Sequence, residues 1–225
     1  MARGDVVRSY GGVSADDRRA DRRRKLVGAA RRSWGHAGLG EVTVRGVCAA
    51  AGLQPRYFYE QFANRDALLV AVADEVRGEL FATLVDSSRD ADGTLEDKLR
   101  AALSAFLGAI AADPDLHRIM RTDLAGIPGL ENRRVDSLNI VADLILQYGS
   151  GIPGFGTPGG ADPRRFARFV AGGVNHLVEN WLVHPDESPE ELADVCTRLC
   201  LGFAGRPGRP LSGSGVADPA RAPSR

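Results

Sequence analysis

The chain has 225 residues, 44% of them apolar and 26% charged, which is the composition of a globular protein with room for a small and a larger domain. No stretch approaches the roughly 20 apolar residues of a membrane-spanning helix, and the N-terminus lacks the apolar run of a secretory signal, so we expect a cytoplasmic protein. The net charge of zero hides a division, because residues 1–65 hold 13 basic and 6 acidic residues whereas residues 66–225 hold 16 and 23. A basic first part favours contact with a polyanion, and a solvated arginine-rich helix surface is the alternative.

The chain begins with a predicted flexible arm and a long helix. Residues 1–16 contain Gly, Ser and Arg without apolar periodicity, so we expect a flexible basic arm. Apolar residues then recur at helical spacing and predict a helix over residues 17–36, which Gly38 ends.

Two short helices follow, joined by a tight turn. Thr43 is suited to cap a helix over residues 44–51, and Gly52 is suited to end it. Pro55 suits the first turn of a third helix that runs to about Phe62. Three helices with so short a turn between the second and third predict a helix-turn-helix domain over residues 17–65.

The rest of the chain predicts further amphipathic helices and no strand. Apolar residues at helical spacing mark helices over about residues 66–86, 95–110, 116–120, 135–145, 163–183 and 189–204. Residues 205–225 have the composition of a disordered tail. The predicted fold is all-α, with the three-helix domain followed by a larger helical domain over residues 66–204.

One stretch of about forty-five residues carries a specific pattern. It contains Leu26-Val27-x-Ala29-Ala30, Trp34, Gly38, Thr43-Val44-Arg45-x-Val47, Ala51-Gly52-Leu53, Tyr57-Phe58-Tyr59-x-x-Phe62 and Arg65-x-x-Leu68-Leu69. The order, spacing and types of these residues resemble the DNA-binding domain of the TetR family of bacterial transcriptional regulators. The resemblance implies a dimer that binds a palindromic operator and is released when its larger domain binds a small molecule. We expect repression rather than activation, because occupying a promoter needs no further contact.

The start of the third helix supplies the candidates for contacts with bases, because N-terminal residues of a recognition helix face the major groove. Arg56 is suited to give two hydrogen bonds to guanine and Gln54 to pair with adenine. Tyr57 is placed to touch a thymine methyl group or a sugar. Thr43 and Arg45, at the positive end of the second helix, are candidates for the phosphate backbone.

The resemblance adds Tyr59 and Arg65 as phosphate contacts. The alternative for the aromatic residues is a place in the core, which we expect for Phe58. Pro55 and Arg56 replace the small or flexible residues usual at these positions in the family, so the operator sequence does not carry over from relatives.

A second basic feature precedes these helices. It comprises Arg18, Arg19, Arg22, Arg23, Arg24 and Lys25, with Arg3 and Arg8 upstream. One hypothesis is that this segment enters a minor groove or follows phosphates. The alternative is a solvated helix face partly neutralised by Asp17 and Asp21.

The larger domain is the expected effector-binding and dimerisation domain. Candidate polar groups for an apolar or amphipathic effector are His117, Arg121, Asn139, Asn175, His176 and Glu179. The alternative for each is an ordinary helix contact, and the sequence does not identify the effector.

The last two long helices, about residues 163–183 and 189–204, are the candidates for the dimer interface. Ala171-Gly172-Gly173 would allow a partner helix to approach closely, and Cys196 and Cys200, one turn apart, are candidates for that seam. With Cys48 they form neither a disulfide framework nor a zinc pattern, and a redox switch is disfavoured.

An enzyme is the weaker hypothesis. Residues 149–159 match the glycine pattern of dinucleotide-binding loops twice, but they follow a helix and contain Pro153 and Pro158. We therefore expect no catalytic site, cofactor or metal. The remaining alternative is an all-α ligand-binding or interaction module that no longer binds DNA.

Overall fold

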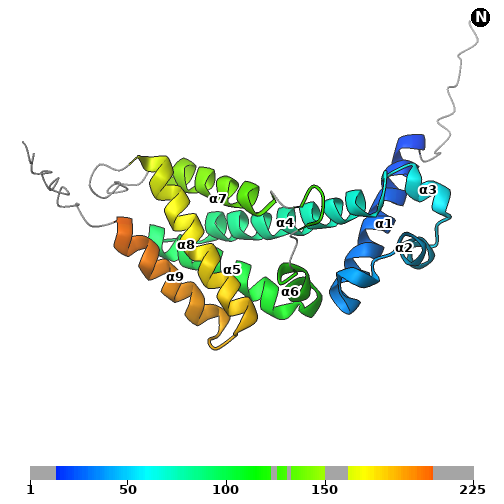
Figure 1. The fold of residues 1–225 in the computed structure, drawn as a ribbon. Coiled ribbons are helices and arrows are strands. Elements are labelled where there is room, and N and C mark those ends of the chain that lie inside the picture. Colours follow the sequence, from blue (N-terminus) through cyan, green and yellow to red (C-terminus); the bar gives the residue numbers. More distant parts are fainter. Residues whose placement is uncertain (1–13, 123–125, 131–132, 150–161, 205–225) are drawn as a thin grey trace, which may run out of the picture.

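The computed structural model describes residues 14–122, 126–130, 133–149 and 162–204, and all regular structure in these ranges is helical. Figure 1 shows an elongated molecule with a small head at one end, built from α1, α2 and α3, and a larger body at the other. Helix α4 extends from the head into the body. Within the described ranges, no helix is both long and apolar enough to span a membrane.

Helix α1 spans Ala15–Ala37 and is capped at both ends by its own sequence. The Ser14 hydroxyl accepts a hydrogen bond from the backbone N–H of Asp17 at 2.9 Å, and the Asp17 carboxylate accepts from the backbone N–H of Ser14. This capping box starts the helix two residues before the predicted position. Gly38, with φ 97°, ends it as predicted. Of the predicted arm, residues 1–13 lie outside the described part.

Helices α2 (Val44–Ala51) and α3 (Pro55–Tyr59) form the predicted helix-turn-helix, after a short 3-10 turn over Leu39–Glu41. The Thr43 hydroxyl accepts from the backbone N–H of Gly46 at 3.1 Å and caps α2. Gly52 ends that helix at φ 67°, in the left-handed region that favours glycine. Helix α3 ends at Tyr59 and continues as a turn, three residues before the predicted end at Phe62.

The head has a filled core. Its buried side chains come from α1, α2, α3, the start of α4 and the segments that join them, and they are Leu26, Ala30, Trp34, Val42, Val47, Phe58, Phe62, Leu68 and Leu69. The second and third helices thus pack on the first, with Leu53 half-buried at the edge of this core. The core fixes the orientation of α3 relative to α1.

Helix α4 (Arg65–Asp90) connects the head to the body, and Asn64 caps its start. Its buried residues recur at helical spacing, so the first turns pack under α1 and the later turns pack along α5. The helix continues four residues past the predicted end at residue 86, because no residue before Gly93 (φ 102°) interrupts it.

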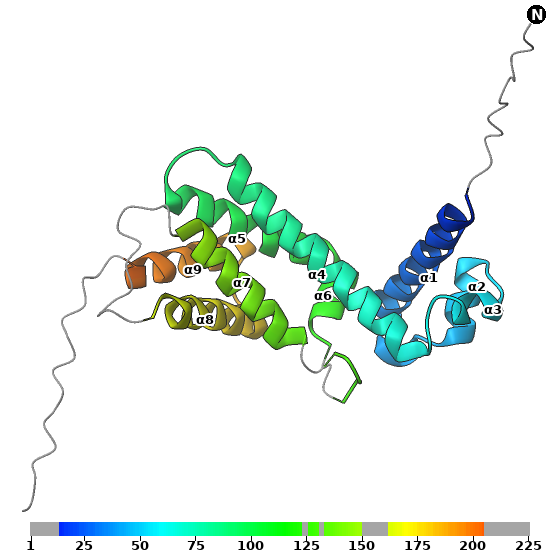
Figure 2. The same cartoon turned by 90° about the horizontal axis from the view of Figure 1, so that it is seen from above.

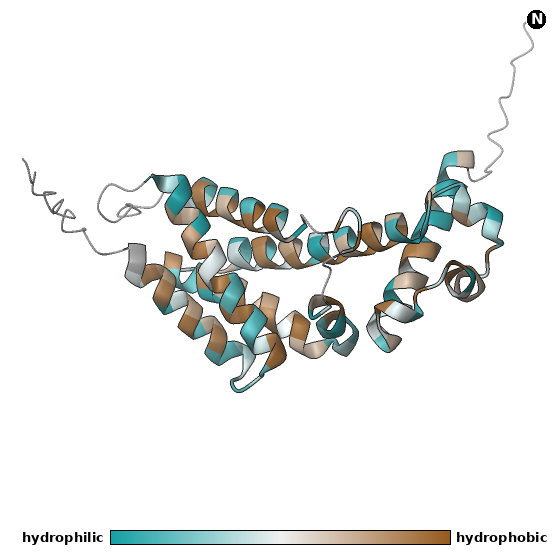
Figure 3. Cartoon of the chain, in the orientation of Figure 1, coloured by the Kyte–Doolittle hydropathy of each residue, from teal (hydrophilic) through white to brown (hydrophobic). Residues whose placement is uncertain are grey.

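The body contains α5 (Leu95–Ala112), α6 (Pro114–Met120), α7 (Arg133–Gly149), α8 (Pro163–Val183) and α9 (Pro189–Ala204). Helix α5 packs between α4 and α9, and α7 packs along α8, as Figure 2 shows from above. Helix α6 lies at the end of the body nearest the head, where it packs mainly against α1. Apolar segments, brown in Figure 3, recur along the helices of the body. Most of the predicted glycine-rich loop and the predicted tail lie outside the described residues.

Candidate DNA-binding surface and ligand cavity

Helix α3 presents polar residues to solvent and one aromatic residue to the core. Gln54, Pro55 and Arg56 are exposed, and the ring of Tyr59 is 62% exposed. Phe58 is fully buried, as expected, and its ring meets that of Tyr59 edge-on at 5.3 Å between centroids. Successive residues of a helix point about 100° apart, so Phe58 can face the core while Arg56 and Tyr59 face solvent.

The ring of Tyr57 lies between two guanidinium groups. The Cζ atoms of Arg22 on α1 and Arg56 on α3 lie 4.9 and 4.8 Å from the ring centroid. Arg56 also donates a hydrogen bond from Nη2 to the Tyr57 hydroxyl at 3.1 Å. This arrangement restricts the rotamers of both α3 side chains and links them to α1.

Much of the basic cluster of α1 is engaged within the head. Arg22 pairs with the Glu60 carboxylate at 3.6 Å, and Arg19 donates to the Glu60 carbonyl at 3.3 Å. The guanidinium of Arg23 lies 4.6 Å from the ring centroid of Phe62. Three arginines that the sequence offered as DNA contacts therefore hold α3 and the turn after it.

Two further basic residues form ion pairs with an acidic residue of the same helix, as the alternative of a partly neutralised helix face expects. Arg24 and Lys25 pair with Asp21 at 3.3 and 2.9 Å, and the hydrogen bond from Lys25 lowers the pKa of that carboxyl. The Asp17 carboxylate accepts the capping hydrogen bond of α1.

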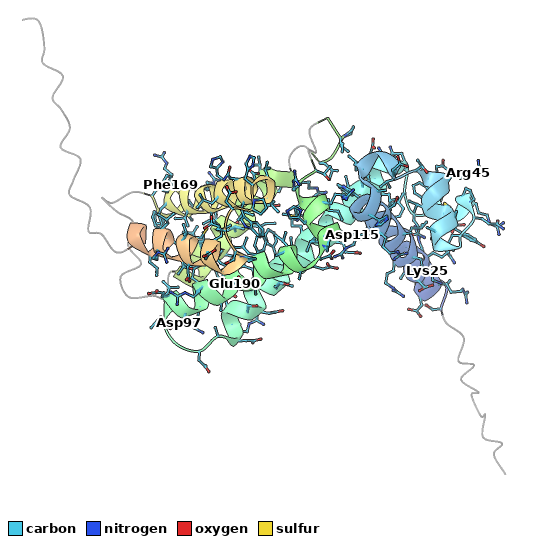
Figure 4. All side chains as sticks on the ribbon, turned by 90° about the horizontal axis from the view of Figure 1, so that it is seen from below. Lys25, Arg45, Asp97, Asp115, Phe169 and Glu190 are labelled. Atoms are coloured by element: carbon cyan, nitrogen blue, oxygen red, sulfur yellow. The ribbon has the colours of Figure 1, made fainter. Side chains whose placement is uncertain are left out.

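The start of α2 exposes Thr43 and Arg45. Figure 4 places Arg45 at the outer end of the head, on the side away from the body. The hydroxyl oxygen of Thr43 already accepts the capping hydrogen bond, which leaves its O–H as a donor. Both residues lie beside the positive end of the α2 dipole, which suits contact with a phosphate.

Arg65 differs from the other predicted DNA contacts because it faces the protein. Its Nε donates to the carbonyl of Val42 at 2.5 Å and its Nη2 to the carbonyl of Leu39 at 2.6 Å. Its Nη1 lies 3.8 Å from a carboxylate oxygen of Asp66. These contacts fasten the segment before α2 to the start of α4.

The body encloses a cavity of about 840 Å³ between α4, α5, α7, α8 and α9. Its walls are mainly leucine, isoleucine, valine and phenylalanine side chains, among them Leu80, Leu84, Leu99, Leu103, Phe106, Leu138, Val141, Leu144, Ile145, Val174 and Val178. At the end nearest the head it also meets Ile119 and Met120 of α6 and Trp34 of α1. The volume falls in the range of pockets that bind small molecules.

Three of the six predicted ligand residues line this cavity, namely Arg121, Asn175 and Glu179. Asn175 and Glu179 stand one turn apart on α8, as the spacing implied. His176 is exposed and Asn139 does not line the cavity, because each is the sequence neighbour of a lining residue and points about 100° away from it on the helix.

His117 also lies outside the cavity lining. Its ring packs edge-on against Trp181, with 6.4 Å between ring centroids. Burial and the nearby Arg121 cation lower the pKa of this histidine, and a backbone hydrogen bond at Leu182 offsets part of that shift.

Sequence reasoning missed three charged residues of the cavity wall: Asp74 and Arg77 on α4 and Arg133 on α7. Asp74 and Arg77 interrupt the apolar face of α4 three residues apart, which was the available signal. Arg133 had no such signal, because only the packing of α7 brings it beside Asp74, with Nη2 and Oδ2 3.2 Å apart.

The head and body meet where α6 packs on α1. The indole Nε1 of Trp34, a cavity-lining residue, donates to the Thr122 hydroxyl just after α6 at 2.9 Å. Next to it, a Cβ added to Gly35 would lie 2.3 Å from the Cβ of Asp115. Figure 4 shows Asp115 at this junction. The backbones of α1 and α6 therefore approach so closely at Gly35 that no side chain fits there. The Trp34 side chain belongs to the head and also lines the cavity.

The head sequence has a family match. Residues 26–72 match the sequence model of the bacterial regulatory proteins of the tetR family. Over these residues the head is therefore similar to the DNA-binding domain of TetR-family regulators. The match covers α1 from Leu26 through the first turns of α4, which includes the exposed surface of α2 and α3.

Solved structures share this fold over most of the chain. A transcriptional regulator from Rhodococcus sp. Rha1 has 21% identity and a TM-score of 0.64, over 80% of this chain and 96% of that one. SmeT, the repressor of a multidrug efflux pump of Stenotrophomonas maltophilia, has 20% identity and a TM-score of 0.62, over 85% and 99%. FadR of Bacillus subtilis, solved with stearoyl-CoA, has 19% identity and a TM-score of 0.60, over 80% and 98%. No curated protein matches the sequence.

The two cysteines of α9 are covered to different degrees within the protomer. Cys196 is fully buried inside the protomer and Cys200 is half-buried at the cavity wall. Burial raises the pKa of Cys196 to about 12 and that of Cys200 to about 11. Burial also raises the pKa of Cys48 in α2. The thiols are therefore protonated at neutral pH, which disfavours redox chemistry.

Proposed function

We propose that the protein is a dimeric repressor that binds a palindromic operator through α3 and releases it when a small molecule fills the body cavity. The observation that carries this proposal is the junction at Trp34, where a cavity-lining side chain belongs to the head that carries α3. The proposed role is binding rather than catalysis, and the proposed place is the cytoplasm, where the operator is accessible.

In this proposal the exposed residues of α3 contact bases. Arg56 donates to guanine and Gln54 pairs with adenine, while Pro55 and Tyr57 pack on sugars and methyl groups in the major groove. The contact of Arg22 with Tyr57 holds this surface in place before DNA arrives.

The phosphate contacts come from around the bases. Tyr59 has an exposed hydroxyl-bearing ring, and Thr43 and Arg45 stand at the start of α2. We assign Arg65 a positioning role, because two of its nitrogens already hold backbone carbonyls beside α2.

The dimer is proposed to form through the outer faces of α8 and α9, over residues 163–183 and 189–204. Phe169 is 61% exposed and Leu199 is 46% exposed, and Gly173 adds an exposed position without a side chain. Burial of such apolar surface stabilises association. A two-fold dimer of this kind would place its two α3 helices in successive major grooves, about 34–36 Å apart.

The release step is proposed to run through α6. A ligand in the cavity would press on Ile119, Met120 and the Trp34 indole, and α6 cannot move without α1 because they meet at Gly35. A ligand that favours a different position of α6 therefore favours a different spacing of the two heads. Two structural neighbours, a repressor of a multidrug efflux pump and a regulator solved with stearoyl-CoA, support repression and a small-molecule ligand.

The test is fluorescence anisotropy of duplex DNA selected from a random pool, at two salt concentrations. We expect tight, salt-sensitive binding to a palindrome. Arg56→Ala should lose about 1–3 kcal/mol of discrimination at one base position. Arg89→Ala is the matched control, because Arg89 pairs with Asp86 on the surface of α4 far from the head. Failure to bind any duplex would favour the alternative of an interaction module.

A further inference from the structure

The charged side chains of the cavity are concentrated at one end. Asp74 and Arg77 lie in the first half of α4, the half nearest the head, and Arg133 is the first residue of α7. The opposite end is formed by apolar residues such as Leu84 and Leu144. The cavity thus has a polar end beside the head and a long apolar remainder.

At the polar end one carboxylate faces two guanidinium groups. Asp74 pairs with Arg77 at 2.9 Å and with Arg133 at 3.2 Å. Around the whole lining, three arginines, the third being Arg121, face the two carboxylates of Asp74 and Glu179. The balance at this end is therefore positive.

The Nε–H group of Arg133 supplies the second observation. It is buried, and it has no hydrogen-bond partner among the described residues. A buried donor without an acceptor is unfavourable, and a guanidinium group is shaped to give two parallel hydrogen bonds to one carboxylate. The Nε edge of Arg133 therefore suits an anionic group entering from the cavity.

We propose that the cavity binds a long-chain amphiphile that carries a carboxylate group. Arg133 and Arg77 hold this carboxylate at the end of the cavity nearest α1. This deepens the proposed function, on which it rests, by naming the ligand class. Residues of α4 from Ala73 to Ser88 line the cavity, a length of roughly 22 Å at 1.5 Å rise per residue, so an extended alkyl chain fits along it. The carboxylate of the ligand would then lie at the end of the cavity that Trp34 and Thr122 line, where α6 meets α1.

The test compares three probes of equal chain length: dodecanoate, dodecan-1-ol and dodecyltrimethylammonium. Displacement of a neutral fluorescent dye from the purified full-length protein gives the affinity of each. We expect dodecanoate to bind about 10- to 100-fold more tightly than the alcohol, and the cation more weakly still. Equal affinity of acid and alcohol, or preference for the cation, would overturn the proposal.

Variants separate the contact with the ligand carboxylate from a structural effect. Arg133→Met should remove the preference for the acid while the alcohol binds within a few-fold of its original affinity, and Arg133→Lys should restore part of the preference. Asp74→Asn should strengthen dodecanoate binding several-fold, because it removes the carboxylate that competes for both arginines. Weaker binding of the acid to Asp74→Asn would contradict the assignment. Arg89→Gln serves as the surface control.

The same samples distinguish this proposal from the proposed function. Dodecanoate that binds with the expected preference but leaves operator DNA bound would support the ligand class and refute the release mechanism. Intact operator binding without any preference for the acid would refute the ligand class alone.

Discussion

The head and the body are both helical, yet they use their apolar residues in opposite ways. In the head, α1, α2 and α3 close around Leu26, Phe58 and Trp34, whose side chains are fully buried. In the body, the pair α7 and α8 stands beside α4, α5 and α9 and leaves about 840 Å³ between them. A filled core holds a surface still for DNA, whereas a hollow core leaves room for a ligand.

Removing the same side-chain volume from each region should give the largest difference in the free energy of unfolding. Leu26→Ala in the filled head should lower the free energy of unfolding by about 2–5 kcal/mol, because it opens a new void. Leu138→Ala at the cavity wall should lower it by less than about 1.5 kcal/mol, because the space beside it already exists. Urea unfolding at one fixed protomer concentration measures both. Equal losses would mean that the cavity collapses around Leu138 and that the body is not hollow in solution.

The junction between the two regions gives the next largest effect. Gly35→Ala should destabilise the protein by about 1–3 kcal/mol, because the new methyl group meets both the side chain and the backbone of Asp115. Gly78→Ala is the matched control in a helix interior, since a Cβ there meets nothing within 4 Å, and it should stabilise α4 by up to about 1 kcal/mol. Thermal unfolding reports both. If Gly35→Ala proved neutral, the contact between α1 and α6 would be looser than the one described.

The smallest expected effect concerns pH at the same end of the body. The pKa of His117 is lower in the folded protein than its ordinary value of about 6.5, mainly because of burial. Between these two values the unfolded chain binds more protons, so this residue makes stability fall as the pH drops through that window. His117→Gln should flatten the dependence of the melting temperature on pH as the pH falls below about 6.5. An unchanged slope in His117→Gln would contradict the assignment.

Much of the head could be predicted from the sequence because its signals are local. Thr43, Gly52 and Pro55 mark the ends of α2 and α3 by rules that act within one helical turn, and the structure follows them. The end of α4 was placed too early, because Ser87 and its neighbours are compatible with both helix and loop.

Side-chain roles depended on tertiary contacts that the sequence does not encode locally. Arg22 was a candidate for DNA contact as one of a basic run, and only the packing of α3 on α1 turns it toward Tyr57 and Glu60. In the same way, Arg65 faces the carbonyls before α2 because α4 starts beneath them.

Helical periodicity and capping act over a few residues, so the all-α class, the three-helix head and the order of helices in the body follow from local sequence. Which polar residues share the cavity depends instead on long-range packing. Asp74 and Arg133 are 59 positions apart in the chain and 3.2 Å apart in space. Their meeting depends on where the start of α7 lies relative to α4, and the packing of whole helices, rather than a local signal, sets that position.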